Sequence, residues 1–227
     1  MLIIETAATE FAERGYDGVS LNALVEASGV SKGAFYFHFS SKEELALAAF
    51  LAKQHELLGR LASNDHPPEE PAADQLARML RLRNQLLAAD RSLACVTRLG
   101  NEMTARSAPG SPYAASQAAA VGLIAEIIET GRRRHEFRPE LDPHATAQAI
   151  FAWVVGIDAL SLSTSDGKDL EERSDEMLAL LLPALLAEPR AGGGVAKNAQ
   201  RSRPPVAPGA AATRRTGTED GGSHDRQ

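Results

Sequence analysis

Residues 29–39 read Gly-Val-Ser-Lys-Gly-Ala-Phe-Tyr-Phe-His-Phe, and this stretch decides the fold. Ser31 can cap a short helix over residues 32–37, because its hydroxyl can accept a hydrogen bond from a free N–H of the first helical turn. Three apolar side chains can pack inward against a preceding helix: Val30, Phe35 and Phe39. Small, polar or basic side chains then stay outside, which is the pattern of a DNA-recognition helix: Ser31, Lys32, Gly33, Ala34, Tyr36 and His38.

The segments on either side complete a helix-turn-helix. An apolar repeat predicts a first helix over residues 2–14, and Gly15 supplies its C-terminal stop. Ser20 can cap a second short helix over residues 21–27, and Ser41 can cap a long one that starts at residue 42. We therefore expect three short helices followed by a long one.

The composition favours helices throughout. Of the 227 residues 44% are apolar and only 5% are aromatic, with Ala and Leu the most frequent apolar types, which are good helix formers. No stretch predicts a strand. Helical patterns follow the long helix at about 74–89, 91–105, 113–134, 143–163 and 169–187. The sequence therefore predicts an all-α fold of about nine helices, with an N-terminal helix-turn-helix domain and a C-terminal helical domain for ligand binding and dimerisation.

Three domain segments are expected. Residues 64–74 contain three prolines, which break helical hydrogen bonding, so this stretch is predicted to be a loop that holds a solvated His66. We expect a helix-turn-helix domain over residues 1–48 and a helical ligand-binding and dimerisation domain over 49–188. Residues 189–227 are rich in Gly, Ala, Pro and Arg and are predicted to be a disordered basic tail.

The net charge of −6 is unusual for a protein that must approach phosphates. Residues 189–227 hold seven Lys and Arg against three Asp and Glu, so the preceding chain is near −10. Within that acidic part, residues 27–42 contain no Asp or Glu and carry Lys32, His38 and Lys42. One local surface is therefore free of negative charge.

Several motifs in residues 3–50 resemble the tetracycline-repressor (TetR) family: Phe11-Ala12-Glu13-Arg14-Gly15-Tyr16, Val19-Ser20-Leu21, Gly29-Val30-Ser31-Lys32-Gly33 and Tyr36-Phe37-His38-Phe39-Ser40-Ser41-Lys42-Glu43-Glu44-Leu45. The resemblance implies a homodimer that represses transcription from a palindromic operator and is released by a small apolar effector. The single cysteine and the lack of a signal-peptide pattern separately predict a cytoplasmic location. The resemblance also implies these DNA-binding residues: Ser20, Ser31, Lys32, Gly33, Ala34, Tyr36, Phe37, His38 and Lys42. Lys32 is the expected base contact, because its ammonium can donate to guanine.

Two departures from the family pattern lower the expected affinity for DNA phosphates. Phe37 stands where many relatives have a second tyrosine, so one hydroxyl is missing. The chain also starts directly at the first helix, where relatives usually carry a basic arm. Either the arm is absent or the start has been assigned too far downstream.

The C-terminal domain carries the expected dimer interface and ligand pocket. Small residues on one helix and apolar residues on the last helix suit a twofold four-helix bundle, with an intramolecular core as the alternative: Ala149, Ala152, Gly156, Ala159, Met177, Leu178, Leu181 and Leu185. Further bulky side chains are candidates to line a pocket, although each could simply be core: Met79, Leu80, Leu86, Val96, Leu99, Met103, Ile127, Phe151 and Trp153.

A narrower resemblance is to γ-butyrolactone autoregulator receptors of actinobacteria. It rests on Trp153-Val154-Val155-Gly156 within residues 142–157, on residues 95–99 and on Ser111-Pro112-Tyr113. Such receptors usually place a tryptophan soon after the Pro-aromatic pair, whereas here residues 114–117 read Ala-Ala-Ser-Gln. An antibiotic or a biosynthetic intermediate therefore stays open as the effector.

Other classes of function find little support in the sequence. The motifs of metallohydrolases, α/β-hydrolases and phosphate-binding loops are missing, and Cys95 is the single cysteine, so we expect no catalysis, metal or cofactor. No apolar run approaches the roughly 18 residues of a membrane span, so no membrane partner is expected. A helical adaptor that binds protein instead of DNA is the remaining alternative.

Overall fold

The structure, a computed structural model, describes residues 2–63, 67 and 69–187. Within these ranges it contains nine α-helices and one isolated β-bridge, between Phe137 and Leu186, which confirms the predicted all-α class. The helices are α1 (Leu2–Arg14), α2 (Leu21–Ser28), α3 (Lys32–His38), α4 (Lys42–Ala62), α5 (Ala72–Ala89), α6 (Arg91–Arg106), α7 (Pro112–Arg133), α8 (Pro143–Ser165) and α9 (Leu170–Leu185). The predicted tail, residues 189–227, and His66 lie outside the described residues.

Serine caps fix the starts of the short helices. Ser20, Ser31 and Ser41 each accept a hydrogen bond from the backbone N–H three residues on, at 3.2, 3.2 and 3.0 Å. Such a cap contributes about 1 kcal/mol. Gly15 and Gly29 follow α1 and α2 with φ of 74° and 67°, a left-handed conformation that a side chain would strain. These predictions of starts and stops are confirmed.

The head, which we define as α1, α2, α3 and the first turn of α4, has its own apolar core. Phe11 of α1, Leu24 of α2 and Phe35 of α3 are all buried in one cluster with Leu45 of α4. Val30 and Phe39 pack against it, as the sequence predicts. The inward side of α3 is thus locked onto α1 and α2.

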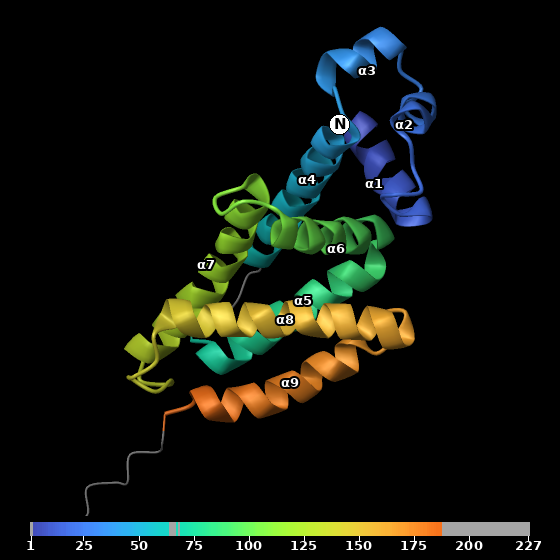
Figure 1. The fold of residues 1–227 in the computed structure, drawn as a ribbon. Helices are drawn as coiled ribbons and strands as arrows, with labels where there is room; N and C mark the ends of the chain where they lie inside the picture. Colours follow the sequence, from blue (N-terminus) through green and yellow to red (C-terminus); the bar gives the residue numbers. More distant parts are fainter. Residues whose placement is uncertain (1, 64–66, 68, 188–227) are drawn as a thin grey trace, which may run out of the picture. The chain divides into compact units, whose positions relative to one another are not determined.

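α4 connects the head to the body, which we define as α5–α9 together with the remainder of α4. In Figure 1 α4 runs from the head down into the body, and α6 crosses it. Both α1 and α4 pack against α6. The predicted domain boundary between residues 48 and 49 falls inside α4, so head and body share one continuous helix.

The body is a helix bundle around a second core. Its buried cluster takes residues from α5, α7, α8 and α9, including Leu76, Ile128, Ile150 and Leu178. Contrary to the sequence prediction, α8 is long and apolar enough to cross a membrane by length and composition, with a mean hydropathy of 1.5. It packs against α7 and α9, and its Asp158 forms an ion pair with Arg83 of α5. We therefore assign α8 to the bundle.

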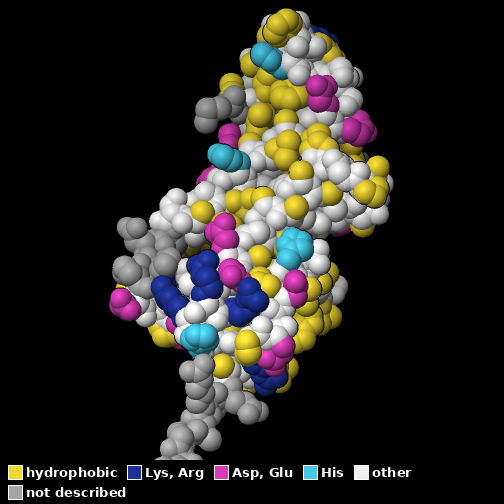
Figure 2. Space-filling view, turned by 90° about the vertical axis from the view of Figure 1, so that its left-hand side faces the viewer, with side chains coloured by type: hydrophobic (Ala, Val, Ile, Leu, Met, Phe, Trp, Pro, Cys, Tyr) yellow, Lys and Arg dark blue, Asp and Glu magenta, His cyan; other side chains and the backbone are white. Residues whose placement is uncertain are grey.

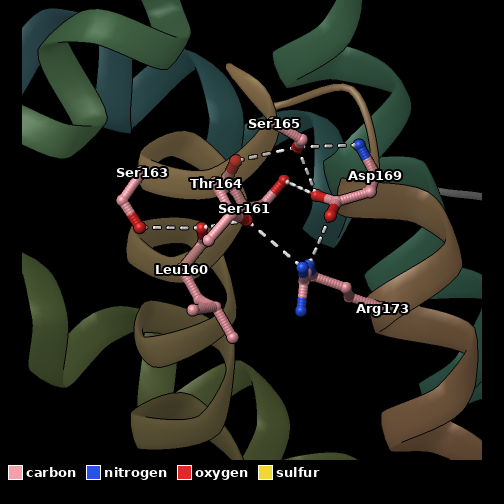
Figure 3. Close-up of polar contacts among 7 residues, drawn as sticks. All are labelled: Leu160, Ser161, Ser163, Thr164, Ser165, Asp169 and Arg173. Carbon is pink, nitrogen blue, oxygen red and sulfur yellow. Dashed lines mark hydrogen bonds and ion pairs between the residues drawn. The ribbon is translucent and has the colours of Figure 1, made fainter.

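A polar cluster holds the turn between α8 and α9 (Figure 3). The Asp169 carboxylate accepts hydrogen bonds from the hydroxyls of Ser161, at 2.5 Å, and Ser165, at 2.6 Å. It also accepts one from Nε of Arg173, at 2.7 Å, and this guanidinium donates to Thr164 at 3.2 Å. The end of α8 is thereby tied to the first turn of α9.

This cluster makes stability depend on acid pH. The hydrogen bonds from Ser161 and Ser165 lower the pKa of Asp169 most, and the hydrogen bond and charge of Arg173 lower it further, from 3.8 to about 2. A depressed carboxylate pKa stabilises the folded state above the unfolded value, and this contribution is lost as the pH falls through the folded value. We predict that Asp169→Asn unfolds at a lower urea concentration than wild type at pH 7. As the pH falls from about 5 to the folded pKa of Asp169, the variant should lose less stability than wild type.

The measurement is the urea midpoint by circular dichroism across that pH range. Asp166→Asn is the matched control, because Asp166 is exposed in the same turn and its left-handed backbone, with φ of 56°, suits asparagine. Equal pH profiles for Asp169→Asn and wild type would contradict the prediction.

Candidate DNA-binding and ligand-binding sites

The outer surface of α3 is small and nearly uncharged. Lys32, Gly33 and Ala34 are exposed in its first turn, directly after the cap at Ser31. Phe35 on the opposite side is fully buried, which fixes the rotation of the helix. A backbone without large side chains can come close to base edges in a major groove, and the Lys32 ammonium is then the group that can reach them.

The second turn of α3 presents aromatic side chains. The Tyr36 hydroxyl donates a 3.4 Å hydrogen bond to the side-chain oxygen of Asn22 on α2, and the Tyr36 side chain is 44% exposed. Phe37 is 84% exposed, and its ring lies 5.1 Å from that of His38. Tyr36, Phe37 and His38 therefore share the exposed side of the head with Lys32, as the resemblance implies.

Lys42 is used inside the head. Its ammonium donates to the backbone oxygens of Tyr16, at 3.0 Å, and Val19, at 3.2 Å, and it lies 4.2 Å from the centroid of the Tyr16 ring. Burial, then the charge and hydrogen bond of Glu43, raise the pKa of Tyr16 to about 12. The structure thus gives Lys42 a role in fixing the turn between α1 and α2, beside the phosphate contact that the resemblance implies.

The head carries little positive charge of its own. In Figure 2 the Lys and Arg side chains on the visible face gather mainly on the body, whereas the head shows mostly apolar and uncharged atoms. Glu44 is exposed in the first turn of α4, and its carboxylate accepts two 2.8 Å hydrogen bonds from the backbone N–H and hydroxyl of Ser40. These bonds, first that of the backbone N–H, lower the pKa of Glu44.

A cavity of about 50 Å³ lies in the body between α4, α5, α6, α7 and α8. Since a buried water needs roughly 10–15 Å³ by this measure, the cavity has room for a few waters. Its walls are apolar, with Phe50, Leu57, Met79 and Ile124 among them. A larger molecule would have to push these helices apart.

The cavity contains some of the predicted pocket residues and not others. Met79, Leu80 and Phe151 line it. Leu86, Val96, Leu99 and Ile127 are buried in core clusters, and Met103 packs against the clusters of Val96 and Leu99. Trp153 is 48% exposed on the outer side of α8. A helical period shows which residues are buried, but it does not tell a cavity wall from a packed contact.

Sequence reasoning missed the polar lining of the cavity. Nε2 of Gln54 donates to the Thr97 hydroxyl at 2.9 Å, and Nε2 of Gln117 donates to the Asn101 side-chain oxygen at 3.2 Å. Arg83 also lines the cavity. The sequence does contain a sign of this polar lining, because Gln54 interrupts an apolar stripe that runs along α4 through Phe50, Leu57 and Leu61.

The same part of α4 holds the junction with the head. The Phe50 ring packs against Tyr113, with centroids 5.0 Å apart, and lies directly on Gly100 of α6. Next to it, the buried Lys53 ammonium forms ion pairs with Glu5 of α1, at 3.1 Å, and with Asp90 before α6, at 3.6 Å. Burial lowers the pKa of Lys53, but the hydrogen bond and charge of Glu5 together with the charges of Asp90 and Glu56 outweigh it, so the net shift is upward.

The predicted dimer residues divide into two groups. On α8, Ala149, Ala152, Gly156 and Ala159 are exposed. On α9, Met177, Leu178 and Leu185 are instead buried in the core of the same chain, with Leu181 packed against it. The outward side of α9 carries Leu180, which is 73% exposed. The four predicted residues of α9 therefore belong to an intramolecular core, which is the alternative that the sequence left open.

Known proteins match both the head and the whole described chain. The family model for bacterial regulatory proteins of the tetR family matches residues 3–49, the same block that carries the motifs of the sequence resemblance. The HTH-type transcriptional regulator TtgR of Pseudomonas putida is 30% identical over 178 residues, covering 74% of this chain and 82% of that protein. These matches confirm the family resemblance.

Two further matches extend over the body. The A-factor receptor protein of Streptomyces griseus is 28% identical over 183 residues, and the match covers 81% of this chain and 62% of the receptor, so this chain spans less than two thirds of it. The match is consistent with the narrower resemblance. The structure of the Bacillus subtilis transcriptional regulator FadR in complex with stearoyl-CoA is 25% identical, with a TM-score of 0.71, covering 82% of this chain and 98% of that one.

The crossing of α4 and α6 leaves no room for a methyl group. A Cβ at Gly100 would overlap the Phe50 ring, which is itself 2% exposed and would have to shift. Overpacking of this kind costs about 1–3 kcal/mol. We predict that Gly100→Ala lowers the free energy of unfolding by that amount, measured by urea denaturation.

Gly122→Ala is the matched control. Gly122 lies inside α7, and a Cβ there meets nothing within 4 Å. Because alanine favours a helix over glycine by about 0.5–1 kcal/mol, this variant should be more stable than wild type. A Gly100→Ala protein as stable as Gly122→Ala would show that the crossing is loose.

Proposed function

Because the chain belongs to the TetR family of bacterial regulatory proteins, we propose that it is a ligand-responsive transcriptional repressor that binds a palindromic operator as a homodimer. A small, largely apolar molecule that enters the body releases it from DNA. We place this action in the cytoplasm. The proposal rests above all on α3, where a buried Phe35 holds an exposed, acid-free surface with Lys32 outward.

DNA binding is assigned to the exposed side of the head. The proposed contacts are Ser20, Ser31, Lys32, Gly33, Ala34, Tyr36, Phe37, His38 and Lys42, with Lys32 at base edges and Tyr36 at a phosphate. In helix-turn-helix dimers two recognition helices about one DNA turn apart read two half-sites. A protein adaptor is not favoured, because the relatives reported above are transcriptional regulators.

The homodimer is assigned to the outward sides of α8 and α9. Ala149, Ala152, Gly156 and Ala159 give α8 an exposed row of small residues, which permits close approach of a second helix. Large exposed apolar side chains flank this row: Trp153 and Leu160, both 48% exposed, and Leu180. A contiguous exposed apolar surface of this kind is typical of an interface between subunits.

The effector is assigned to the cavity between α4 and α8. It lies against α4 and α6, the helices that also contact the head, so a molecule that widened it would move both. The relatives' names point to different ligands, A-factor in one and stearoyl-CoA in another. The ligand class of this chain must therefore be argued from its own cavity.

Replacing Lys32 tests the proposal. Losing a base contact costs about 1–3 kcal/mol, so we predict that Lys32→Ala weakens binding to the DNA that flanks its own gene by roughly 5- to 150-fold. Fluorescence anisotropy at a fixed moderate salt concentration measures this, since phosphate binding depends steeply on salt.

Lys168→Ala is the control for Lys32→Ala. It makes the same change in charge at an exposed lysine in the turn after α8 and should leave the affinity unchanged. If Lys32→Ala and Tyr36→Ala both bind the DNA as wild type does, the repressor proposal fails.

A further inference from the structure

One charged side chain, Arg83, lines the cavity in the described part of the chain. Its guanidinium is bound at two points by the Asp158 carboxylate, through Nη1 at 3.1 Å to one oxygen and through Nη2 to the other. Nη1 also donates to the Asn84 side-chain oxygen at 3.2 Å. Both partners of the ion pair are largely buried, with side chains 11% and 20% exposed.

We propose that this cavity selects uncharged amphiphilic ligands, and that the Arg83–Asp158 pair excludes carboxylate and phosphate ligands. The inference rests on the proposed function and names the class of its effector. Because Asp158 already balances the guanidinium, the pair adds no net charge to the cavity. An anion that displaced Asp158 from Arg83 would leave a largely buried carboxylate without its partner, a costly state. An anion that used the remaining N–H donors of Arg83 would lie beside the Asp158 carboxylate, whose negative charge repels it.

The other polar groups of the cavity suit a neutral ligand. Thr97 accepts a hydrogen bond from Gln54 with its oxygen, and its hydroxyl hydrogen can be donated to a carbonyl. Asn101 accepts from Gln117 with its side-chain oxygen, and its NH₂ group is also a donor. The surrounding wall of Phe50, Leu57 and Met79 suits an alkyl chain. An ester, ketone or alcohol with such a chain therefore matches the site.

The test compares two ligands of equal chain length, methyl octanoate and octanoate, by isothermal titration calorimetry at pH 7.5. Their alkyl chains make the same apolar contribution and the ester methyl adds roughly fourfold, so a larger ratio of affinities reports the effect of charge. We expect the full-length wild-type protein to bind methyl octanoate at least tenfold tighter than octanoate. Asp158→Asn frees the positive charge of Arg83, so this ratio should fall at least fivefold in the variant.

Asp175→Asn is the matched control. Asp175 pairs with Arg81 at 2.9 Å on the same helix as Arg83, but both side chains are half exposed and neither lines the cavity. The affinity ratio should stay at the wild-type value in this variant. The wild-type comparison needs no variant, so the inference can be tested even if Asp158→Asn does not fold.

Three results would overturn the inference: octanoate bound as tightly as methyl octanoate by wild type, an unchanged ratio in a folded Asp158→Asn, or binding of neither ligand by either protein. DNA binding by the same preparations separates this inference from the proposed function. Wild-type protein that binds its DNA but prefers octanoate overturns only the ligand class. Wild-type protein that does not bind this DNA contradicts the proposed repressor function itself.

Discussion

Where α4 crosses α6, the Phe50 ring lies on Gly100 with no space between them, and the rest of the structure depends on this contact. It fixes the angle at which α4 leaves the body, and the head is built on the start of α4. Three residues further along α4, Lys53 ties the helix to Glu5 of α1 and to Asp90 before α6. Gln54, next in the chain, faces the cavity. One helical turn therefore contacts the head, the body and the cavity together.

This arrangement explains how a small change in the body can reach DNA. Packed interfaces move between discrete arrangements because their interiors are close-packed. Phe50 and Gln54 both line the cavity, and both belong to the helix that follows α3, so a molecule that displaced either side chain would act on that helix. Head and body have no flexible linker between them in the described chain, so the displacement is carried by α4 itself.

The charge of the head makes dimerisation essential to the proposed function. The head has a single exposed lysine on α3, and Lys42 is held by the backbone oxygens of Tyr16 and Val19. Phe37 offers no hydroxyl to a phosphate. Since most non-specific affinity comes from phosphate neutralisation, one such head should bind DNA weakly. In the proposed homodimer, two heads joined through α8 and α9 would act together, which raises the affinity through effective concentration.

The head could be predicted almost completely from the sequence because its determinants are local. Serine caps, glycine stops and the inward Phe35 act within one or two helical turns. The inward side of the last helix could not be predicted, because leucines occur on both of its sides: Leu178 and Leu185 are buried, whereas Leu180 is exposed. Only the packing of α9 on α5 and α8 decides which side faces inward. The polar lining of the cavity was missed because its residues meet across helices that are far apart in the sequence.

The central claim is that two copies of this head read DNA as one unit. DNase I footprinting of the purified full-length protein on the DNA flanking its own gene tests it most directly. We predict a protected palindrome, with two half-sites whose centres lie about one helical turn, roughly 34–36 Å, apart. A lack of protection even at low salt, or protection of one isolated half-site, would contradict it.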